Sequence, residues 1–279
     1  MERAGTVFEH GHALNSEIER DMGLPTLDLS SRTAVVVGGT SGIGLTIAKG
    51  LAEAGANVVP TGRRLERAQA TARDIEAMGC ASFATACDVG DRTSLERLLD
   101  TTCAAFGKVD ILVNSAGITQ RMPALDVTEG EWNRILETNL NGTLRCCQVF
   151  GRHMIDRQYG RIINIASLAS FIAFFEVAAY AASKAAVASL TTSLAIEWAR
   201  YGVCVNALVP GFFRTDLNSA LLDGTPRGKE ILLRTPMGRF GKLEELKGAA
   251  VFLASEAASF VTGHLLVVDG GFLAGGVNQ

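Results

Sequence analysis

The chain has 279 residues and a mass of 29.5 kDa, a size that an α/β fold can reach with one hydrophobic core. Hydrophobic residues make up 48% of it and charged residues 20%, a composition that excludes a disordered chain and indicates a large buried core. Its formal net charge is -3 and it contains no long basic block, so nothing points to a nucleic-acid-binding surface or a surface for anionic membranes.

The expected compartment follows from the N-terminus, the cysteines and the apolar stretches. No basic-then-apolar leader opens the chain, and its six cysteines form no C-x-x-C pair. The longest apolar stretches, such as residues 168–182, are interrupted by polar side chains and are shorter than the roughly 18 to 20 residues that span a bilayer. We therefore expect a soluble, cytoplasmic protein with reduced cysteines, without a metal site and without membrane or nucleic-acid partners.

Residues 1–26 are polar and irregular, and we expect them to form an N-terminal extension to a single domain at residues 27–279. From residue 33 onward, apolar runs rich in β-branched residues alternate with amphipathic stretches of helical period. The runs predict strands at residues 33–37, 57–61, 82–86, 109–113, 161–166, 202–207 and 265–268. Continuous apolar strands separated by helices are typical of a parallel sheet covered on both faces. The pattern predicts an α/β fold, a single doubly wound (Rossmann) domain of about seven strands, with its ligand crevice at the carboxyl ends of the strands.

A glycine-rich loop joins the first predicted strand to the first amphipathic helix. Gly38 can adopt backbone angles that other residues avoid, whereas Gly42 and Gly44 lack the Cβ that would block a phosphate or a neighbouring strand. The loop directs backbone N–H groups and the positive end of a helix dipole outward, which suits a dinucleotide pyrophosphate. Its spacing, G-x-x-x-G-x-G, is looser than G-x-G-x-x-G, so a plain strand-to-helix turn is the alternative. The cofactor-binding residues expected here are Gly38, Thr40, Ser41, Gly42, Ile43 and Gly44.

The end of the second predicted strand indicates which dinucleotide is bound. An acidic residue about 20 positions beyond the glycines would bind a free ribose 2′-hydroxyl, but Thr61-Gly62-Arg63-Arg64 stands there. The missing carboxylate removes a repulsion, and Arg63 can form charge-assisted hydrogen bonds to a 2′-phosphate. We therefore expect NADP as the cofactor, with NAD as the second possibility. The alternative is that Arg63 and Arg64 only solvate the start of a helix.

Tyr180 and Lys184 stand four residues apart at the start of a predicted helix, which places a phenol and an ammonium on one face. A free phenol titrates near pH 10, and an ammonium held beside it would favour the phenolate and lower its pKa. Such a tyrosine can exchange a proton near neutral pH. Ser167 closes the fifth predicted strand, 13 residues earlier, so its hydroxyl can reach the same crevice. Taken alone, Tyr-x-x-x-Lys also occurs on ordinary amphipathic helices.

Taken together, these motifs resemble those of the short-chain dehydrogenase/reductase family between about Leu29 and Phe272. The shared order and spacing covers the glycine loop, Asn114-Ser115-Ala116-Gly117, Asn139, Ser167, Tyr180-x-x-x-Lys184, Pro210-Gly211 and Val268-Asp269-Gly270-Gly271. Two departures are mild: Val37 stands where the family usually has threonine, and Ser115 replaces the second asparagine of Asn-Asn-Ala-Gly. Both would remove side-chain hydrogen bonds that support the cofactor site, and neither changes a residue of the chemistry.

The resemblance implies a catalytic set of four residues. Tyr180 would exchange a proton with the substrate oxygen, and Ser167 would orient and polarise that oxygen. Lys184 would lower the pKa of Tyr180 and bind the nicotinamide ribose, and Asn139 would hold a water of a proton relay. Further cofactor contacts are implied at Arg63, Asp88, Val89, Asn114, Ala116, Gly117, Tyr180, Lys184, Pro210, Gly211, Phe213 and Thr215. For Asp88, a plain role at the start of a helix is an equal alternative.

The expected function is that of an NAD(P)-dependent oxidoreductase that interconverts a secondary alcohol and a ketone. Within the family the chain most resembles gluconate 5-dehydrogenase and related sugar-acid dehydrogenases, through residues 117–121, 234–239 and 263–271. The expected substrate-binding residues are Arg121, Ser167 and Tyr180. The Arg121 guanidinium would bind the carboxylate of a sugar acid such as gluconate. Alternatively, Arg121 pairs on the surface with Asp126 or Glu129.

Two other functions stay open at this point. A 3-oxoacyl thioester reductase would need a basic patch for an acidic carrier protein, and a catalytically silent dinucleotide sensor would need no intact catalytic set. Residues 210–237 form an irregular stretch that is too long for a simple connection, and we expect it to be a substrate lid. The alanine-rich face of the helix that carries Tyr180 permits close helix packing, and the resemblance implies a homotetramer.

Overall fold

The structure of the protein is a computed structural model that describes residues 25–215 and 219–276. Seven parallel strands form one sheet in the order β3-β2-β1-β4-β5-β6-β7. They are β1 (Thr33–Val37), β2 (Asn57–Gly62), β3 (Thr85–Ala86), β4 (Ile111–Asn114), β5 (Gly160–Ile165), β6 (Val203–Pro210) and β7 (Leu265–Val268). The strand order reverses between β1 and β4, and doubly wound folds bind their ligands at the carboxyl ends of the strands beside such a switch point. The predicted fold class is confirmed.

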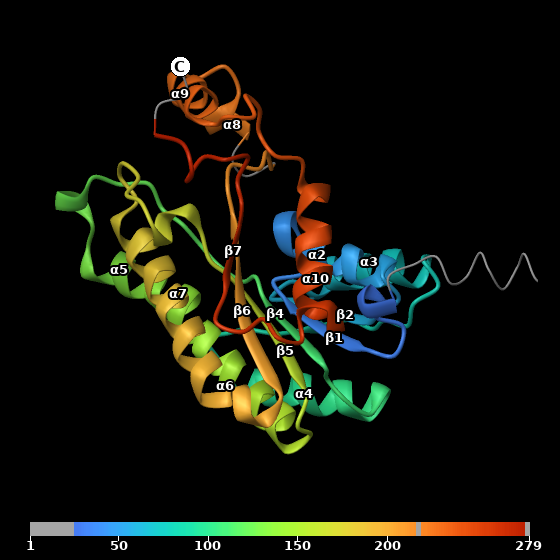
Figure 1. Cartoon of the computed structure of the whole chain (residues 1–279). Coiled ribbons are helices and arrows are strands. Elements are labelled where there is room, and N and C mark those ends of the chain that lie inside the picture. The colour runs from blue at the N-terminus through green and yellow to red at the C-terminus, as the bar shows by residue number, and fades with distance from the viewer. Residues whose placement is uncertain (1–24, 216–218, 277–279) are drawn as a thin grey trace, which may run out of the picture.

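Helices cover both faces of the sheet (Figure 1). The longer ones are α2 (Gly42–Glu53), α3 (Leu65–Glu76), α4 (Arg92–Phe106), α5 (Glu129–Leu136), α6 (Gly142–Asp156), α7 (Ala178–Trp198), α9 (Pro226–Arg234) and α10 (Lys247–Ala254), and α8 (Ser219–Leu222) is a single turn. One face of the sheet shares a core with α2, α3 and α10, and the other with α4, α6 and α7.

The side chains of β1 alternate between these two cores. Ala34 and Val36 belong to the cluster that contains α2 and α10, whereas Val35 and Val37 belong to the cluster that contains α4 and α6. All four are buried, as the period of two along a strand requires when both faces are covered. The continuous apolar run of β1 is therefore the direct consequence of its central place in the sheet.

Several strand boundaries differ from the predicted ones by one or two residues, and those of the third and sixth strands differ by three. The third strand, expected at residues 82–86, has only two residues, and Ser82 contributes an isolated bridge to Val58. This strand lies at the edge of the sheet, where it pairs on one side only, so less of it is held in register. The sixth strand runs three residues further than expected, to Pro210, and pairs with β7 up to that residue.

A third apolar cluster lies beyond the carboxyl ends of β6 and β7. It contains Leu222 and Ile231, from α8 and α9, together with Phe272. The rings of Phe174, Phe212 and Phe272 meet there, with centroids 5.3 to 6.3 Å apart. Figure 1 shows α8 and α9 above this end of the sheet, and they belong to the stretch expected to be a lid.

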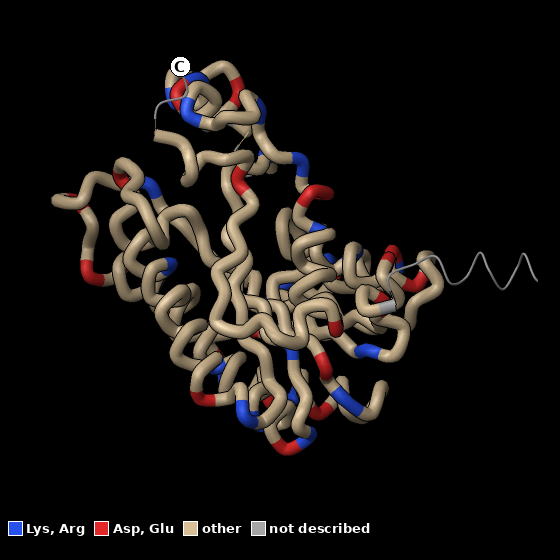
Figure 2. Tube along the Cα trace, in the orientation of Figure 1, with Lys and Arg blue, Asp and Glu red and all other residues tan. Residues whose placement is uncertain are grey.

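The predicted N-terminal extension, residues 1–26, lies outside the described residues except for its last two, which open a short 3₁₀ turn at Pro25–Leu27. Acidic and basic side chains are interspersed along the described trace (Figure 2). Across residues 25–215 and 219–276, no helix combines the length and the apolar character that a bilayer crossing requires. The six cysteines, which all lie in this part of the chain, are free thiols.

Candidate active site

Tyr180 and Ser167 meet at the carboxyl end of β5. Ser167 follows that strand and its hydroxyl accepts a hydrogen bond from the Ala169 N–H at 3.1 Å, which fixes the side chain at the start of a 3₁₀ turn. Tyr180 stands in the first turn of α7, and the Ser167 side chain is near enough to its hydroxyl to lower the pKa of the phenol. The structure therefore brings together the proton-exchanging phenol and the hydroxyl expected to orient the substrate.

The pKa of Tyr180 differs from the expectation. Burial raises it above its ordinary value of 10, because the phenolate loses its hydration, and the Ser167 side chain only partly offsets this. The Nζ of Lys184 lies 5.8 Å from the centroid of the Tyr180 ring and donates to the Ile165 carbonyl at 2.6 Å.

Lys184 is itself strongly affected by burial. Its side chain projects from α7 and is buried, and the loss of hydration lowers the pKa of the ammonium from 10.5 to about 8. Gly117, after β4, lies beside it: a Cβ there would be in ordinary contact, 3.6 Å from Lys184 Nζ and 3.4 Å from Asn139 Oδ1. The ends of β4 and β5 thus meet α7 around this lysine.

Asn139 stands in a π-helical turn, Glu137–Asn141, between α5 and α6. Its side chain is fully buried, with Oδ1 accepting from the Ile118 N–H at 2.8 Å and Nδ2 donating to the Ile118 carbonyl at 2.9 Å. The same Nδ2 donates to Ser183 Oγ at 3.0 Å, and Ser183 Oγ donates to the Tyr180 carbonyl at 2.7 Å. Asn139 therefore ties the segment after β4 to the helix that carries Tyr180. Short π-helical turns are frequent at functional sites.

The glycine loop has the close contacts that a dinucleotide cradle needs. Gly38 has φ +82, and a Cβ there would lie 2.6 Å from the Ala116 nitrogen, while a Cβ on Gly44 would overlap the Gly38 carbonyl oxygen. Gly42 has φ +50, and a Cβ there would meet only Thr215 Cγ2, at 3.9 Å. Ser41 precedes α2 without a side-chain capping bond, so the first N–H groups of the helix stay available for an anion. These residues fit a dinucleotide, and Thr40 to Gly44 with Ala116 are the ones that would hold it.

Thr40 and Arg63 lie around the end of β2. A Cβ on Gly62 would be 3.1 Å from Thr40 Oγ1, so the glycine permits this approach. Arg63 is exposed immediately beyond the strand, and Arg64 is the N-cap residue of α3 without a capping bond. The strand end therefore presents a hydroxyl and two cationic side chains, and residues 61–64 contain no acidic residue.

Asp88 and Val89 follow β3. Asp88 is exposed, and its Oδ1 accepts from the Gly90 N–H at 2.9 Å. The helix-start alternative for Asp88 is wrong, because Asp91 caps α4 by accepting from the Thr93 N–H at 3.0 Å. The Val89 side chain is buried.

Asn114 is tied into the sheet. Its Nδ2 donates to Asn164 Oδ1 at 2.8 Å and to Cys147 Sγ at 3.3 Å, which links β4 to β5 and α6. Its own Oδ1 is buried and has no hydrogen-bond partner among the described residues. Buried oxygens of this kind are rare.

The segment after β6 reaches back to the glycine loop. Pro210 ends the strand, and a Cβ on Gly211 would lie 2.6 Å from Asp269 Cα. Thr215 lies opposite Gly42. The Phe213 ring is buried in the core, and a β-bridge pairs this residue with Gly241.

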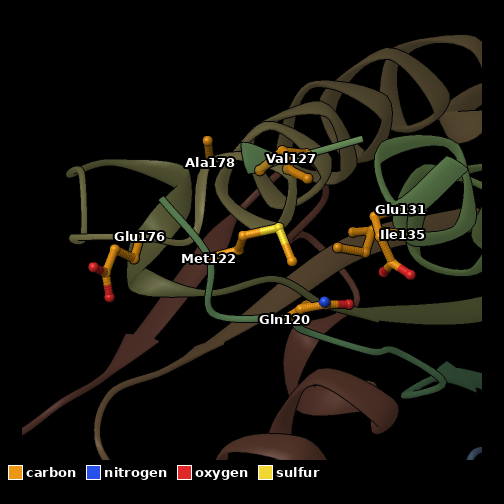
Figure 3. Close-up of a pocket in the computed structure, with 8 residues that line it drawn as sticks. Gln120, Met122, Val127, Glu131, Ile135, Glu176 and Ala178 are labelled. Atoms are coloured by element: carbon orange, nitrogen blue, oxygen red, sulfur yellow. The ribbon is translucent and has the colours of Figure 1, made fainter. Parts of the chain in front are cut away.

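Arg121 has a partner that the sequence did not indicate. Its Nε lies 2.6 Å from Oε2 of Glu176, rather than near the expected Asp126 or Glu129. Glu176 and Met122 also line a pocket beside the start of α7 (Figure 3), with Gln120, Val127, Glu131, Ile135, Ala178 and Ala179. Ser183 and Glu176 are therefore the neighbours of the site that sequence reasoning missed.

Comparisons with known proteins agree with this geometry. A family model described as enoyl-(acyl carrier protein) reductase matches residues 37–273. Gluconate 5-dehydrogenase of Gluconobacter oxydans is 42% identical over 246 residues, which are 87% of this chain and 95% of that protein. D-threitol dehydrogenase of Mycolicibacterium smegmatis is 40% identical over 244 residues, 88% of this chain and 94% of that protein.

The solved structures include a gluconate 5-dehydrogenase from Burkholderia cenocepacia in complex with NADP and tartrate. It matches with a TM-score of 0.87 and 43% identity, over 90% of this chain and 98% of that one. The resemblance expected from the motifs is thus confirmed over nearly the whole described chain. The chain belongs to the short-chain dehydrogenase/reductase family and is an NAD(P)-dependent oxidoreductase that acts on CH–OH groups.

Proposed function

We propose that this protein oxidises a secondary hydroxyl of a sugar acid such as gluconate, and reduces the corresponding ketone, with NADP. The observation that carries the proposal is the proximity of Ser167 to Tyr180 at the carboxyl end of β5, where the serine lowers the pKa of the phenol. Lys184 lies behind the Tyr180 ring, and Asn139 ties the site to the segment after β4. A catalytically silent sensor has no need of this complete set.

In oxidation, Tyr180 acts as the phenolate: its Oη takes the proton of the substrate hydroxyl while Ser167 holds the substrate oxygen. In reduction, the neutral phenol returns that proton to the new alkoxide. Hydride transfer is the chemistry that a bound nicotinamide supplies. Lys184, held by the Ile165 carbonyl, would bind the nicotinamide ribose, and Asn139 links the backbone of Ile118 to the helix that carries Tyr180.

The preference for NADP rests on the end of β2. Thr40 Oγ1 and Arg63 can both hydrogen-bond to a 2′-phosphate, and no carboxylate repels it there. The related gluconate 5-dehydrogenase from Burkholderia cenocepacia was crystallised with NADP.

A sugar acid is supported by Arg121, on the segment after β4, and by the name of the Gluconobacter oxydans relative. A neutral polyol is the second candidate, because Glu176 already pairs with Arg121 and because one relative is a D-threitol dehydrogenase. An acyl carrier substrate has less support. Arg121, on the segment after β4, and Arg214, on the segment after β6, are each paired with a carboxylate, which leaves them less suited to an acidic carrier.

We further propose a cytoplasmic homotetramer whose residues 210–237 act as a substrate lid. The alanine-rich helix α7 presents small exposed side chains together with the exposed Ile196, a surface suited to a second copy. The lid proposal is supported by the place of α8 and α9 beyond the carboxyl ends of β6 and β7 (Figure 1).

The test is an initial-rate screen that follows NADPH or NADH formation with a panel of sugar acids and neutral polyols. We expect turnover of gluconate or a deoxygluconate with NADP at a higher kcat/KM than with NAD. Turnover of polyols without turnover of any acid would contradict the proposed substrate class. Reduction of 3-oxoacyl thioesters alone would support the carrier-protein alternative.

A further inference from the structure

Glu176 stands four residues before Tyr180, in the segment that joins β5 to α7. Its carboxylate meets the Arg121 guanidinium, with Oε2 and Nε 2.6 Å apart. Its backbone carbonyl also accepts a hydrogen bond from the Met122 N–H at 2.8 Å. Two separate bonds therefore hold the segment after β4 against the segment before α7.

The backbone of Glu176 adopts a conformation that L-residues avoid. Its φ is +64, and among the described non-glycine residues only Gln158 shares a positive φ. Glycine would satisfy this backbone at lower cost. The presence of glutamate is explained by its side chain, which is 21% exposed and reaches the 49% exposed Arg121.

The carboxylate lies on the side of Arg121 rather than inside the neighbouring apolar pocket. In Figure 3, the Met122 side chain extends toward Val127 and Ile135, whereas the Glu176 carboxylate points away from them. An arginine that already holds a carboxylate carries little net charge toward a second one. A bound acid must then displace Glu176 or approach it as a like charge.

We propose that Glu176 is a specificity-determining residue that competes with the carboxylate of the substrate for Arg121. It thereby weakens the binding of acids relative to neutral polyols. This rests on the proposed function, in which Arg121 faces the bound substrate. A neutral polyol meets neither the displacement nor the repulsion, so its affinity is independent of the Glu176 charge.

The test measures binding without turnover, on the full chain saturated with NADPH, by calorimetry. Tartrate and threitol are a matched pair, because both have a four-carbon chain with hydroxyls on the two inner carbons. The end groups are carboxylates in tartrate and neutral hydroxymethyl groups in threitol. In Glu176→Gln, and in Glu176→Gly, which suits the positive φ, we expect the Kd of tartrate to fall by about three- to tenfold. The Kd of threitol should change by less than twofold, and adding Arg121→Ala should abolish the gain for tartrate.

An unchanged tartrate Kd, an equal change for both ligands, or no tartrate binding by the Glu176 variants would overturn the inference, leaving Glu176 as a link between two segments. A raised tartrate Kd would also overturn it, since Glu176 would then orient Arg121 for the acid. Gln158→Gly is the control: it relieves the other positive φ, before β5, and should leave both Kd values unchanged. A protein that shows the expected pattern but oxidises no sugar acid would lose the proposed substrate class and retain this inference.

Discussion

Burial acts on both ionisable side chains of the catalytic set and favours the neutral form of each. It raises the pKa of the Tyr180 phenol and lowers the pKa of the Lys184 ammonium to about 8. A neutral phenol is the form that donates a proton to a ketone being reduced. The enclosed position of Tyr180 therefore prepares the site for reduction near neutral pH.

The buried ammonium of Lys184 predicts a pH-dependent stability. Its folded-state pKa of about 8 lies below the ordinary 10.5, so the unfolded chain binds more protons between these values. The contribution of Lys184 to stability is thus fully present above about pH 10.5 and is lost as the pH falls through 8. Between pH 7.5 and 9.5, the free energy of unfolding of the wild type should rise relative to that of Lys184→Met by about 1 to 2 kcal/mol. Urea unfolding at both pH values measures this, and a constant or falling difference would contradict it.

The proposed preference for NADP can be tested at one side chain, that of Arg63. If it binds the 2′-phosphate, Arg63→Ala should raise the Kd of NADP by about tenfold or more, the scale of a charged hydrogen bond, and leave the Kd of NAD nearly unchanged. Fluorescence titration with both cofactors measures this. Arg64→Ala is the matched control and should have a small effect on either cofactor. Equal loss of both cofactors in Arg63→Ala, or a wild type that prefers NAD, would refute the assignment.

Among the elements that the sequence did not predict is the π-helical turn Glu137–Asn141. Its residues continue the helical stretch between α5 and α6, and no glycine, proline or change of period marks the wider turn. The turn nonetheless has one specific effect: it places the Asn139 amide between Ile118 and Ser183, to both of which the amide is hydrogen-bonded.

Asn139→Ala should lower the free energy of unfolding by about 2 kcal/mol, because it removes the side-chain partner of the partly buried N–H and carbonyl of Ile118. Urea unfolding measures the change. Asn141→Ala, on the same turn, removes only an exposed bond to the Glu137 carboxylate and should change stability by less than about 0.5 kcal/mol. Similar losses in the two variants would show that the Asn139 amide has no special structural role.

Across the whole molecule, the sheet was predictable because each central strand is a continuous apolar run. Such a run also indicates that both faces of the sheet are covered. The neighbours of the site were less predictable. Glu176 and Arg121 are 55 residues apart in sequence, and a glutamate gives no signal of its positive φ. The burial that raises the pKa of Tyr180 likewise depends on how the chain folds around it, whereas the spacing from Tyr180 to Lys184 showed only that they share a helix face.

The proposed tetramer predicts a mass in solution of four times the 29.5 kDa chain, measured by light scattering after gel filtration. Ile196→Glu places a charge on the exposed face of α7 and should reduce that mass. Met78→Glu replaces an exposed apolar side chain after α3, on the other face of the sheet, and should leave the mass unchanged. A monomeric wild type, or an unchanged mass for Ile196→Glu, would contradict the proposed arrangement.

The central claim is that Tyr180 moves the proton when a sugar acid is oxidised with NADP. Its most direct test is the initial rate of NADPH formation from gluconate by the wild type and by Tyr180→Phe, with the Kd of NADP measured in parallel. The ring still fills its place in the variant, so the Kd should stay within about twofold while kcat falls by at least about 10²-fold, as for general acid–base groups. Retention of more than about a tenth of the wild-type kcat would contradict the account.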